Sequence, residues 1–542
     1  MLEVLVPAAP PLPGPAMPRL LALVAVLALA VLALAGPARA DLAARVDQLV
    51  EAKAAADKVS LSPPADDAEF LRRATLDLAG TLPSAAEAKA FLADADPKKR
   101  DKRIAALLAA PTYAERMTDL FHVALMEHLG DSPEWTAYLR KSFAANAPWD
   151  AMARDMLRAD TKNADKLGAA FFLSKRLENY GQNPVDHSAL TRDVGRLFLG
   201  KNFQCCECHD HLVVEEYKQQ DFQGLHAFFR NLTLVNAAKL QVGEKVTAEK
   251  LGFASVFTKV QMATAPALPG GKMLDIPSFP KGQEFAEPPD RKTNSPGTPK
   301  FSTLAAAAEL IPRADNRDFT RNIVNRVWFA LLGRGLVHPL DLHHSANPGS
   351  HPELLDLLAT EFAAKRFDIK WLIGELVRTK TYQRASRLPA GAERADPWYF
   401  GTAIEKRLSA DQLLSATLTA TGTDAKAADA LRAKFHKAFD NQPRDPEDEI
   451  APSLKAALFV LHDAAVLKLF EPTPGNLVSR LAALPDEGIA DELYLAVLTR
   501  RPSAEEARTV REVLAKHAGA RPAAIGRVAW ALVASLEFGV NH

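Results

Sequence analysis

The sequence predicts a mainly α-helical protein, with two helical domains joined by a small β insert and a proline-rich connection. Apolar residues recur every three or four positions over most of the chain, which is typical of one face of an α-helix. Several helix starts carry a capping box, in which a Ser is followed three positions later by Glu or Gln. A chain of 542 residues is also longer than one hydrophobic core usually serves, so more than one domain is expected.

The first forty residues, 1–40, are predicted to be a secretory signal peptide whose start is Met17. A short basic segment precedes an apolar run over residues 20–35, and Ala38 and Ala40 supply the small residues of a cleavage site. An uncleaved membrane anchor is the alternative. No later stretch is apolar enough to cross a bilayer. The mature chain is therefore expected to be exported to the periplasm or beyond, with no transmembrane segment.

The first domain is predicted over residues 41–230, as helices joined by turns that contain Pro or Gly. Gly80 ends an early helix, and Ser84 with Glu87 forms the capping box of the next. Gly200 ends the helix that precedes the only cysteines of the chain. Further helices are expected from apolar stripes around residues 104–108, 121–129, 149–157, 190–198 and 222–229.

Residues 231–300 have a different composition, which predicts a small β insert and a linker. The runs 233–235 and 254–260 favour strands, and glycines and prolines separate them. A proline-rich connection over residues 277–300 is the expected domain boundary.

The second helical domain is predicted over residues 301–542. An apolar face runs from Phe319 to Leu332 and ends at Gly333. The charged, proline-rich stretch 425–452 is expected to be a surface loop. Three further helices are predicted from capping boxes at Ser350 with Glu353, Ser409 with Gln412, and Ser503 with Glu506.

The charge balance excludes one class of partner. Lys and Arg number 66, as do Asp and Glu, so the formal net charge is zero. This removes any global electrostatic basis for binding nucleic acid. A glycine-rich phosphate loop and a G-x-S-x-G nucleophile elbow are also missing from the sequence.

All three cysteines lie in one stretch that reads N-F-Q-C-C-E-C-H-D-H over residues 202–211. Cys205, Cys208 and His209 form C-x-x-C-H, the pattern of covalent haem attachment in c-type cytochromes. The two cysteines would be the thioether donors and His209 the axial ligand of the haem iron. Export suits such attachment. The predicted function is therefore electron transfer, or haem-assisted redox chemistry, with a redox or cell-envelope protein partner.

The sixth iron ligand is not evident from the sequence. The candidates near the motif are Met262, Met273, His187, His226 and His211. His211 is the least suitable, because it lies two residues from His209 and does not easily reach the opposite face of the haem.

Two alternatives to haem remain open. Cys205, Cys208, His209 and His211 could bind zinc or iron, although tetrahedral sites normally draw their ligands from two separated pairs. The stretch could otherwise be a structural clip in a cell-envelope interaction protein, through a local disulfide or reduced thiols. Cys206, which has no part in haem attachment, favours this second alternative. A hydrolase of extracellular polymers rests on export and size alone, so catalytic residues stay unknown.

Other polar residues have a structural and a functional interpretation. Asp210 could orient a neighbouring histidine or cap a helix or turn. His343, His344 and His351 lie near Asp341 and could form a metal or catalytic site. Alternatively, His351 belongs to the first turn of a helix and the other two histidines to a polar loop.

The chain resembles exported proteins of the planctomycete cytochrome type, which pair two domains of unknown function. The resemblance covers most of residues 55–542. It implies a cytochrome-like domain with CxxCH followed by a helical companion domain, and it settles no activity. Leu212 departs from the His-Asp-His-Pro pattern that relatives often show. The motifs that carry the resemblance are residues 70–80, 198–200, 205–211, 221–229, 325–328, 333–335, 350–355, 381–383 and 535–538.

Overall fold

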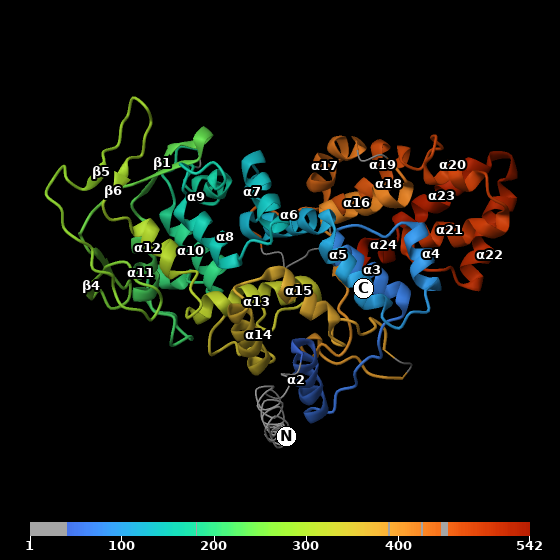
Figure 1. Ribbon diagram of the computed structural model, residues 1–542, viewed down its shortest axis with the longest axis horizontal. Coiled ribbons are helices and arrows are strands. Elements are labelled where there is room, and N and C mark those ends of the chain that lie inside the picture. Colours follow the sequence, from blue (N-terminus) through green and yellow to red (C-terminus); the bar gives the residue numbers. More distant parts are fainter. Residues whose placement is uncertain (1–40, 180, 389–390, 424–425, 446–453) are drawn as a thin grey trace, which may run out of the picture.

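The computed structural model describes residues 41–542, apart from 180, 389–390, 424–425 and 446–453 (Figure 1). The signal peptide predicted for residues 1–40 lies outside the described residues. The protein is mainly helical, as predicted, and its described strands form four small two-stranded antiparallel sheets.

The N-terminal half is a succession of helices with short connections. The capping box of Ser84 and Glu87 is confirmed at the start of α4, and Gly80 ends α3 in the left-handed conformation with φ +72°. The helices are α2 (Leu42–Ala56), α3 (Asp67–Ala79), α4 (Ala85–Ala93), α5 (Lys99–Ala109), α6 (Pro111–Met126), α7 (Pro133–Ala144), α8 (Trp149–Arg158), η1 (Leu167–Ala170), α9 (Phe171–Arg176), α10 (His187–Leu199), η2 (Cys205–Glu207) and α11 (Gln219–Phe229).

Three hairpins follow, within the stretch where strands were predicted. The predicted strand over 254–260 is wrong, because residues 255–260 form the turn between β3 and β4. A run of β-branched and aromatic residues favours a strand locally, and tertiary context has placed this one at a hairpin tip. The elements are β1 (Leu232–Asn236), η3 (Ala237–Lys239), β2 (Gln241–Glu244), β3 (Leu251–Ala254), β4 (Gln261–Thr264), β5 (Phe285–Glu287) and β6 (Thr298–Pro299).

The C-terminal half is again helical, with two departures from prediction. Ser350 forms no capping box, because His351 occupies the N-cap position of α14 and makes no side-chain cap. The expected surface loop at 425–452 contains α17, whose Leu431 and Phe435 are buried. The capping boxes at Ser409 and Ser503 are confirmed.

These C-terminal elements are α12 (Thr303–Leu310), α13 (Arg317–Leu332), α14 (Pro352–Ala364), α15 (Ile369–Arg378), η4 (Pro397–Tyr399), β7 (Lys406–Arg407), α16 (Ala410–Thr421), α17 (Lys426–Phe439), α18 (Leu454–His462), α19 (Ala464–Lys468), α20 (Leu477–Ala482), α21 (Asp486–Leu498), α22 (Ala504–Lys516), η5 (Ala518–Ala520), α23 (Arg521–Val533), α24 (Leu536–Gly539) and β8 (Val540–Asn541).

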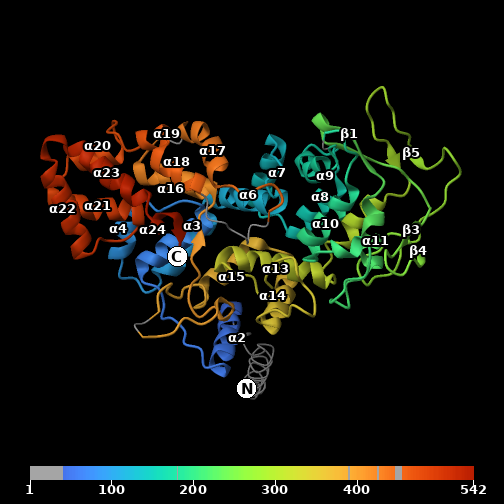
Figure 2. The ribbon, with the colours of Figure 1, turned by 180° about the vertical axis from the view of Figure 1, so that it is seen from behind.

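The buried apolar residues form two cores. One core extends from α2 to Phe400, and the other combines α3 and α4 with residues 408–538. Helix α3 contributes Phe70 to the first core and Leu71 to the second, because its residues 70–78 are buried on every side of the helix, charged side chains included. In both views α6 crosses the middle of the molecule, between the side formed by α8–α12 and the side formed by α16–α24 (Figures 1 and 2).

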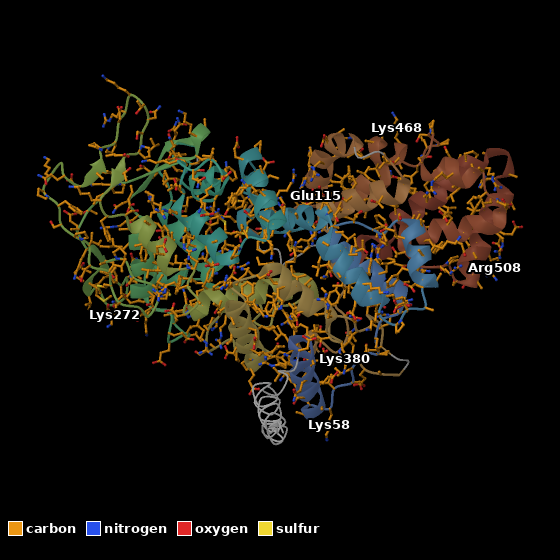
Figure 3. The ribbon with its side chains drawn as sticks, viewed as in Figure 1. Lys58, Glu115, Lys272, Lys380, Lys468 and Arg508 are labelled. Atoms are coloured by element: carbon orange, nitrogen blue, oxygen red, sulfur yellow. The ribbon has the colours of Figure 1, made fainter. Side chains whose placement is uncertain are left out.

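Charged side chains lie at the outer edge of the molecule, where Lys272, Lys468 and Arg508 are labelled in Figure 3. Among the helices of the described residues, none combines the length and the apolar character that crossing a membrane requires.

Candidate functional site

The cysteine stretch is a loop between α10 and α11. Helix α10 ends at Gly200, which has φ +67° and donates its N–H to Arg196. The carbonyl oxygen of Gly200 accepts the backbone N–H of His343 at 3.0 Å. A side chain is strained here, because φ is in the left-handed region and a Cβ on Gly200 would lie 2.8 Å from Cδ2 of His343. The start of the loop, directly after α10, therefore packs closely against the segment that contains His343.

The three cysteines have different environments, and all three thiols are free. Cys205 and Cys208 are exposed, whereas Cys206 is completely buried. Burial raises the pKa of the Cys206 thiol to about 12, so it stays protonated and behaves as a small apolar side chain. The loop thus presents to solvent the two cysteines of C-x-x-C-H and packs the third inside.

His209 is held in one orientation by its neighbours. Its Nδ1–H donates to the backbone carbonyl of Asp210 at 2.6 Å, and its ring lies 4.6 Å from that of Phe257. This hydrogen bond places the ring proton on Nδ1 and leaves Nε2 with a free lone pair. Histidines that bind metals usually donate their other ring N–H in this way, and a backbone carbonyl is a common acceptor. Nε2 of His209 is therefore the ring nitrogen available to a metal.

Side chains of α11 and the backbone of the β3–β4 hairpin hold the main chain of the loop. The Glu207 carbonyl accepts from Nε2 of Gln219 at 3.3 Å and from Nε2 of Gln223 at 2.9 Å. The Cys208 carbonyl accepts the Val256 N–H at 3.0 Å. None of these three contacts was predicted, because each depends on how α11 and the hairpin pack in space.

Apolar side chains are exposed around the same loop. Val256, Phe257 and Val260 at the hairpin tip have 46%, 64% and 57% of their surface exposed. Leu212 and Val213, directly after the histidines, are 76% and 78% exposed. Exposed apolar patches in soluble proteins mark surfaces that bind a ligand or a partner. The two exposed cysteines thus lie in a loop that is followed by, and hydrogen-bonded to, segments with exposed apolar side chains.

Asp210 and His211 have structural roles. The Asp210 carboxylate accepts the N–H of Gln219 at 2.9 Å, in the first turn of α11, and lies 3.5 Å from Nζ of Lys218. Asp210 therefore caps a helix through its side chain and orients His209 through its carbonyl. Nδ1 of His211 accepts the N–H groups of Val213 and Val214, so its ring closes the turn after the motif.

Two of the histidines proposed as sixth ligands are already engaged. Nε2 of His187 is hydrogen-bonded to the Leu232 carbonyl at 2.8 Å, and Nδ1 of His226 contacts the Thr191 hydroxyl at 2.9 Å. Burial lowers the pKa of His226 to about 4. Met262 lies on β4, in the hairpin whose tip contacts Cys208, and Met273 is exposed farther along the chain.

The second histidine group does not converge on one point. His343 is half-buried, and its Nε2 accepts from Nδ2 of Asn325 at 3.3 Å; desolvation of its ring lowers its pKa to about 3. His344 packs edge-on against Tyr217, and His351 starts α14 beside Phe400. Asp341 instead accepts hydrogen bonds from Arg196 and Arg326.

Among the described residues, no three His, Cys, Asp or Glu side chains lie close enough together to hold a metal ion. A cavity of about 300 Å³ lies elsewhere, between α6, α13 and α16, and no residue of 202–211 lines it. The cysteine loop is thus a surface site.

The fold and the loop define a mainly helical protein with an exposed C-x-x-C-H motif. Residues 45–233 match the family PSCyt2, described as a protein of unknown function (DUF1549). Residues 305–480 match PSD1, also described as a protein of unknown function (DUF1553). The chain therefore carries two domains of unknown function in the order that the sequence resemblance implies. Comparison with curated proteins gave no match, and comparison with solved structures gave none either.

Proposed function

We propose that this chain is an exported protein that carries one c-type haem, attached through Cys205 and Cys208 and bound at the iron by His209. Each thiol would add across one vinyl group, so that the S–H bond and the π bond of the vinyl C=C break, a C–S and a C–H bond form, and no external oxidant or reductant is needed. Bound haem supplies one-electron redox chemistry. The protein would exchange electrons with a redox or cell-envelope protein partner.

The observation that carries the proposal is the hydrogen bond from Nδ1 of His209 to the Asp210 carbonyl. It fixes the tautomer that leaves Nε2 available, in the same loop as two exposed, free thiols. The exposed Phe257 and Val260 supply apolar surface beside them, which suits a macrocycle with an apolar face.

The proposal is tested by producing the chain in a host that matures c-type cytochromes. We expect the purified protein to begin at Asp41 and to give a peroxidase-stained band on a denaturing gel, because only covalent haem survives denaturation. Protein that is exported with intact Cys205 and Cys208 but remains unstained contradicts it.

The alternative is a non-haem metal site or a structural clip, and one observation favours the clip. The Glu207 carbonyl accepts from Gln219 and Gln223, and the Cys208 carbonyl accepts from Val256, so hydrogen bonds within the protein stabilise the shape of the loop. Elemental analysis separates these cases. One iron per chain with stained haem supports the first proposal, one zinc per chain supports a metal site, and neither metal supports the clip.

A further inference from the structure

The cavity between α6, α13 and α16 lies where the two cores meet, and it is distinct from the cysteine loop. Its volume of about 300 Å³ is within the range of small-molecule binding sites. Part of its wall is apolar and aromatic, from Met117, Phe121, Trp149, Ile323, Val327 and Phe329. The rest is polar and carries charges of both signs, from Asp77, Arg116, Asp119, Glu127, Arg326, Asp341, Glu405, Lys406 and Arg407.

One arginine in this wall has an unusual environment. Arg116 is only 8% exposed, and its guanidinium donates no hydrogen bond to any residue of the described chain; its Nε is fully buried. The other buried arginines, Arg72, Arg73, Arg176 and Arg384, each donate to at least one carbonyl oxygen. A buried charge without hydrogen-bond acceptors is unfavourable. The guanidinium of Arg116 therefore lacks an acceptor, which a bound ligand would supply.

The carboxylates near Arg116 do not satisfy it. Asp77 is paired with Nζ of Lys406 at 2.6 Å, and Asp411 is paired with an arginine and a histidine of α17. Asp119, one turn from Arg116 on α6, makes no hydrogen bond or ion pair among the described residues, so it does not hold the guanidinium either. Asp77, Asp119 and Asp411 therefore interact with Arg116 through longer-range electrostatic attraction, without a hydrogen bond to its guanidinium.

We propose that this cavity binds a small organic acid, with its carboxylate on the guanidinium of Arg116 and its apolar body against the aromatic wall. A guanidinium matches a carboxylate with two parallel hydrogen bonds, which provides both energy and orientation. Oδ1 of Asn541, which also lines the cavity, is buried and accepts no hydrogen bond, so a ligand hydroxyl or N–H has an acceptor there. This site is independent of haem attachment.

Titration calorimetry on the full mature chain tests the proposal. The probes are 4-phenylbutyrate and octanoate, each compared with the alcohol of the same carbon skeleton. We expect the acids to bind more tightly than the alcohols, and Arg116→Met to weaken the acids by about tenfold or more while leaving the alcohols unchanged. Glu115→Gln is the matched control, because Glu115 is on the same helix but exposed (Figure 3), and its effect should stay within about twofold.

Circular dichroism checks that the variants fold. If Arg116→Met does not fold, Arg116→Lys keeps the charge without the planar fork and should still weaken the acids. Ala124→Phe, which fills the cavity from α6 and leaves Arg116 intact, should abolish binding of acids and alcohols alike. The proposal is overturned if neither acid binds the wild-type chain, or if both variants, Arg116→Lys and Ala124→Phe, bind the acids as the wild type does.

Discussion

The cysteine loop and the α6–α13–α16 cavity place their chemistry in opposite ways. In the loop, Gln219 and Gln223 hold the Glu207 carbonyl, and the thiols of Cys205 and Cys208 are exposed and free. In the cavity, the wall is packed and the charge of Arg116 stays inside without an acceptor. Each place thus holds groups that have no partner within the described chain: the thiols of Cys205 and Cys208 in the loop, and the guanidinium of Arg116 in the cavity. Those unused groups are the ones we assign to ligands.

The largest effect is expected at the cysteines. Replacing both Cys205 and Cys208 by Ser should abolish covalent haem, because no thioether can form. Cys206→Ala is the control and should keep the haem, since the Cys206 thiol is buried and faces the core. Mass spectrometry of the tryptic peptide 202–218 detects the haem adduct. An adduct that disappears in Cys206→Ala but persists in the double variant would contradict the assignment.

A second effect distinguishes a structural arginine from one reserved for a ligand. Arg176 donates to Asp193 at 2.8 Å and to the Leu125 carbonyl at 2.8 Å. Arg176→Met therefore removes a donor from the buried Leu125 carbonyl and one partner from the Asp193 carboxylate, which keeps Arg196 at 3.2 Å. We expect Arg176→Met to lower the free energy of unfolding of the protein by about 3 kcal/mol or more. Arg116→Met should lower it by less than about 1 kcal/mol, or raise it, because no hydrogen bond is lost. Urea unfolding measures both. Equal losses would show that Arg116 is structural.

A third effect concerns the anchor of the loop. Gly200→Ala should destabilise the protein by about 2–3 kcal/mol, because the left-handed conformation is strained for Ala and the new Cβ meets His343. Gly181→Ala is a matched control, because Gly181 has φ +62° but no atom within 4 Å of its Cβ position. Gly181→Ala should lower the free energy of unfolding by about 1 kcal/mol. Equal costs in thermal or urea unfolding would mean that the contact with His343 is not tight.

The smallest effect depends on pH. Burial and the nearby Asp411 raise the pKa of Asp119 to about 6, while Arg116, and Arg432 and His436 of α17, oppose the rise. Because the unfolded chain then releases this proton more readily, Asp119 lowers stability as pH rises from about 4 to 6. Asp119→Asn should therefore stabilise the protein at pH 7 by at most about 2 kcal/mol. Most of that gain should disappear at pH 4. A gain that is the same at both pH values contradicts the raised pKa.

The sequence predicted those parts of the fold that depend on neighbours in the chain. The capping boxes at Ser84, Ser409 and Ser503 are confirmed because a cap involves residues three positions apart. The sequence did not predict α17, because charges and prolines around residues 425–452 outweighed an apolar stripe that only tertiary packing makes significant. The turn at residues 255–260 was missed for the same reason.

For the candidate sites too, the sequence predicted only the features that depend on residues close together in the chain. Cys205, Cys208 and His209 were predicted because a motif of adjacent residues can be recognised without a fold. The roles of Phe257 and of the Asp210 carbonyl could not be predicted, since they depend on the hairpin and the loop conformation. The cavity joins residues from α3 to β8, and no pattern within any one segment indicates it.

The most direct test of the central claim is the haem content of the exported wild-type chain after maturation. The alkaline pyridine spectrum of purified protein measures it, relative to protein concentration. The loop geometry predicts one haem per chain, with the spectrum of two thioether bonds. Folded, exported protein with no haem, in which Cys205 and Cys208 still react with a thiol reagent, would contradict it.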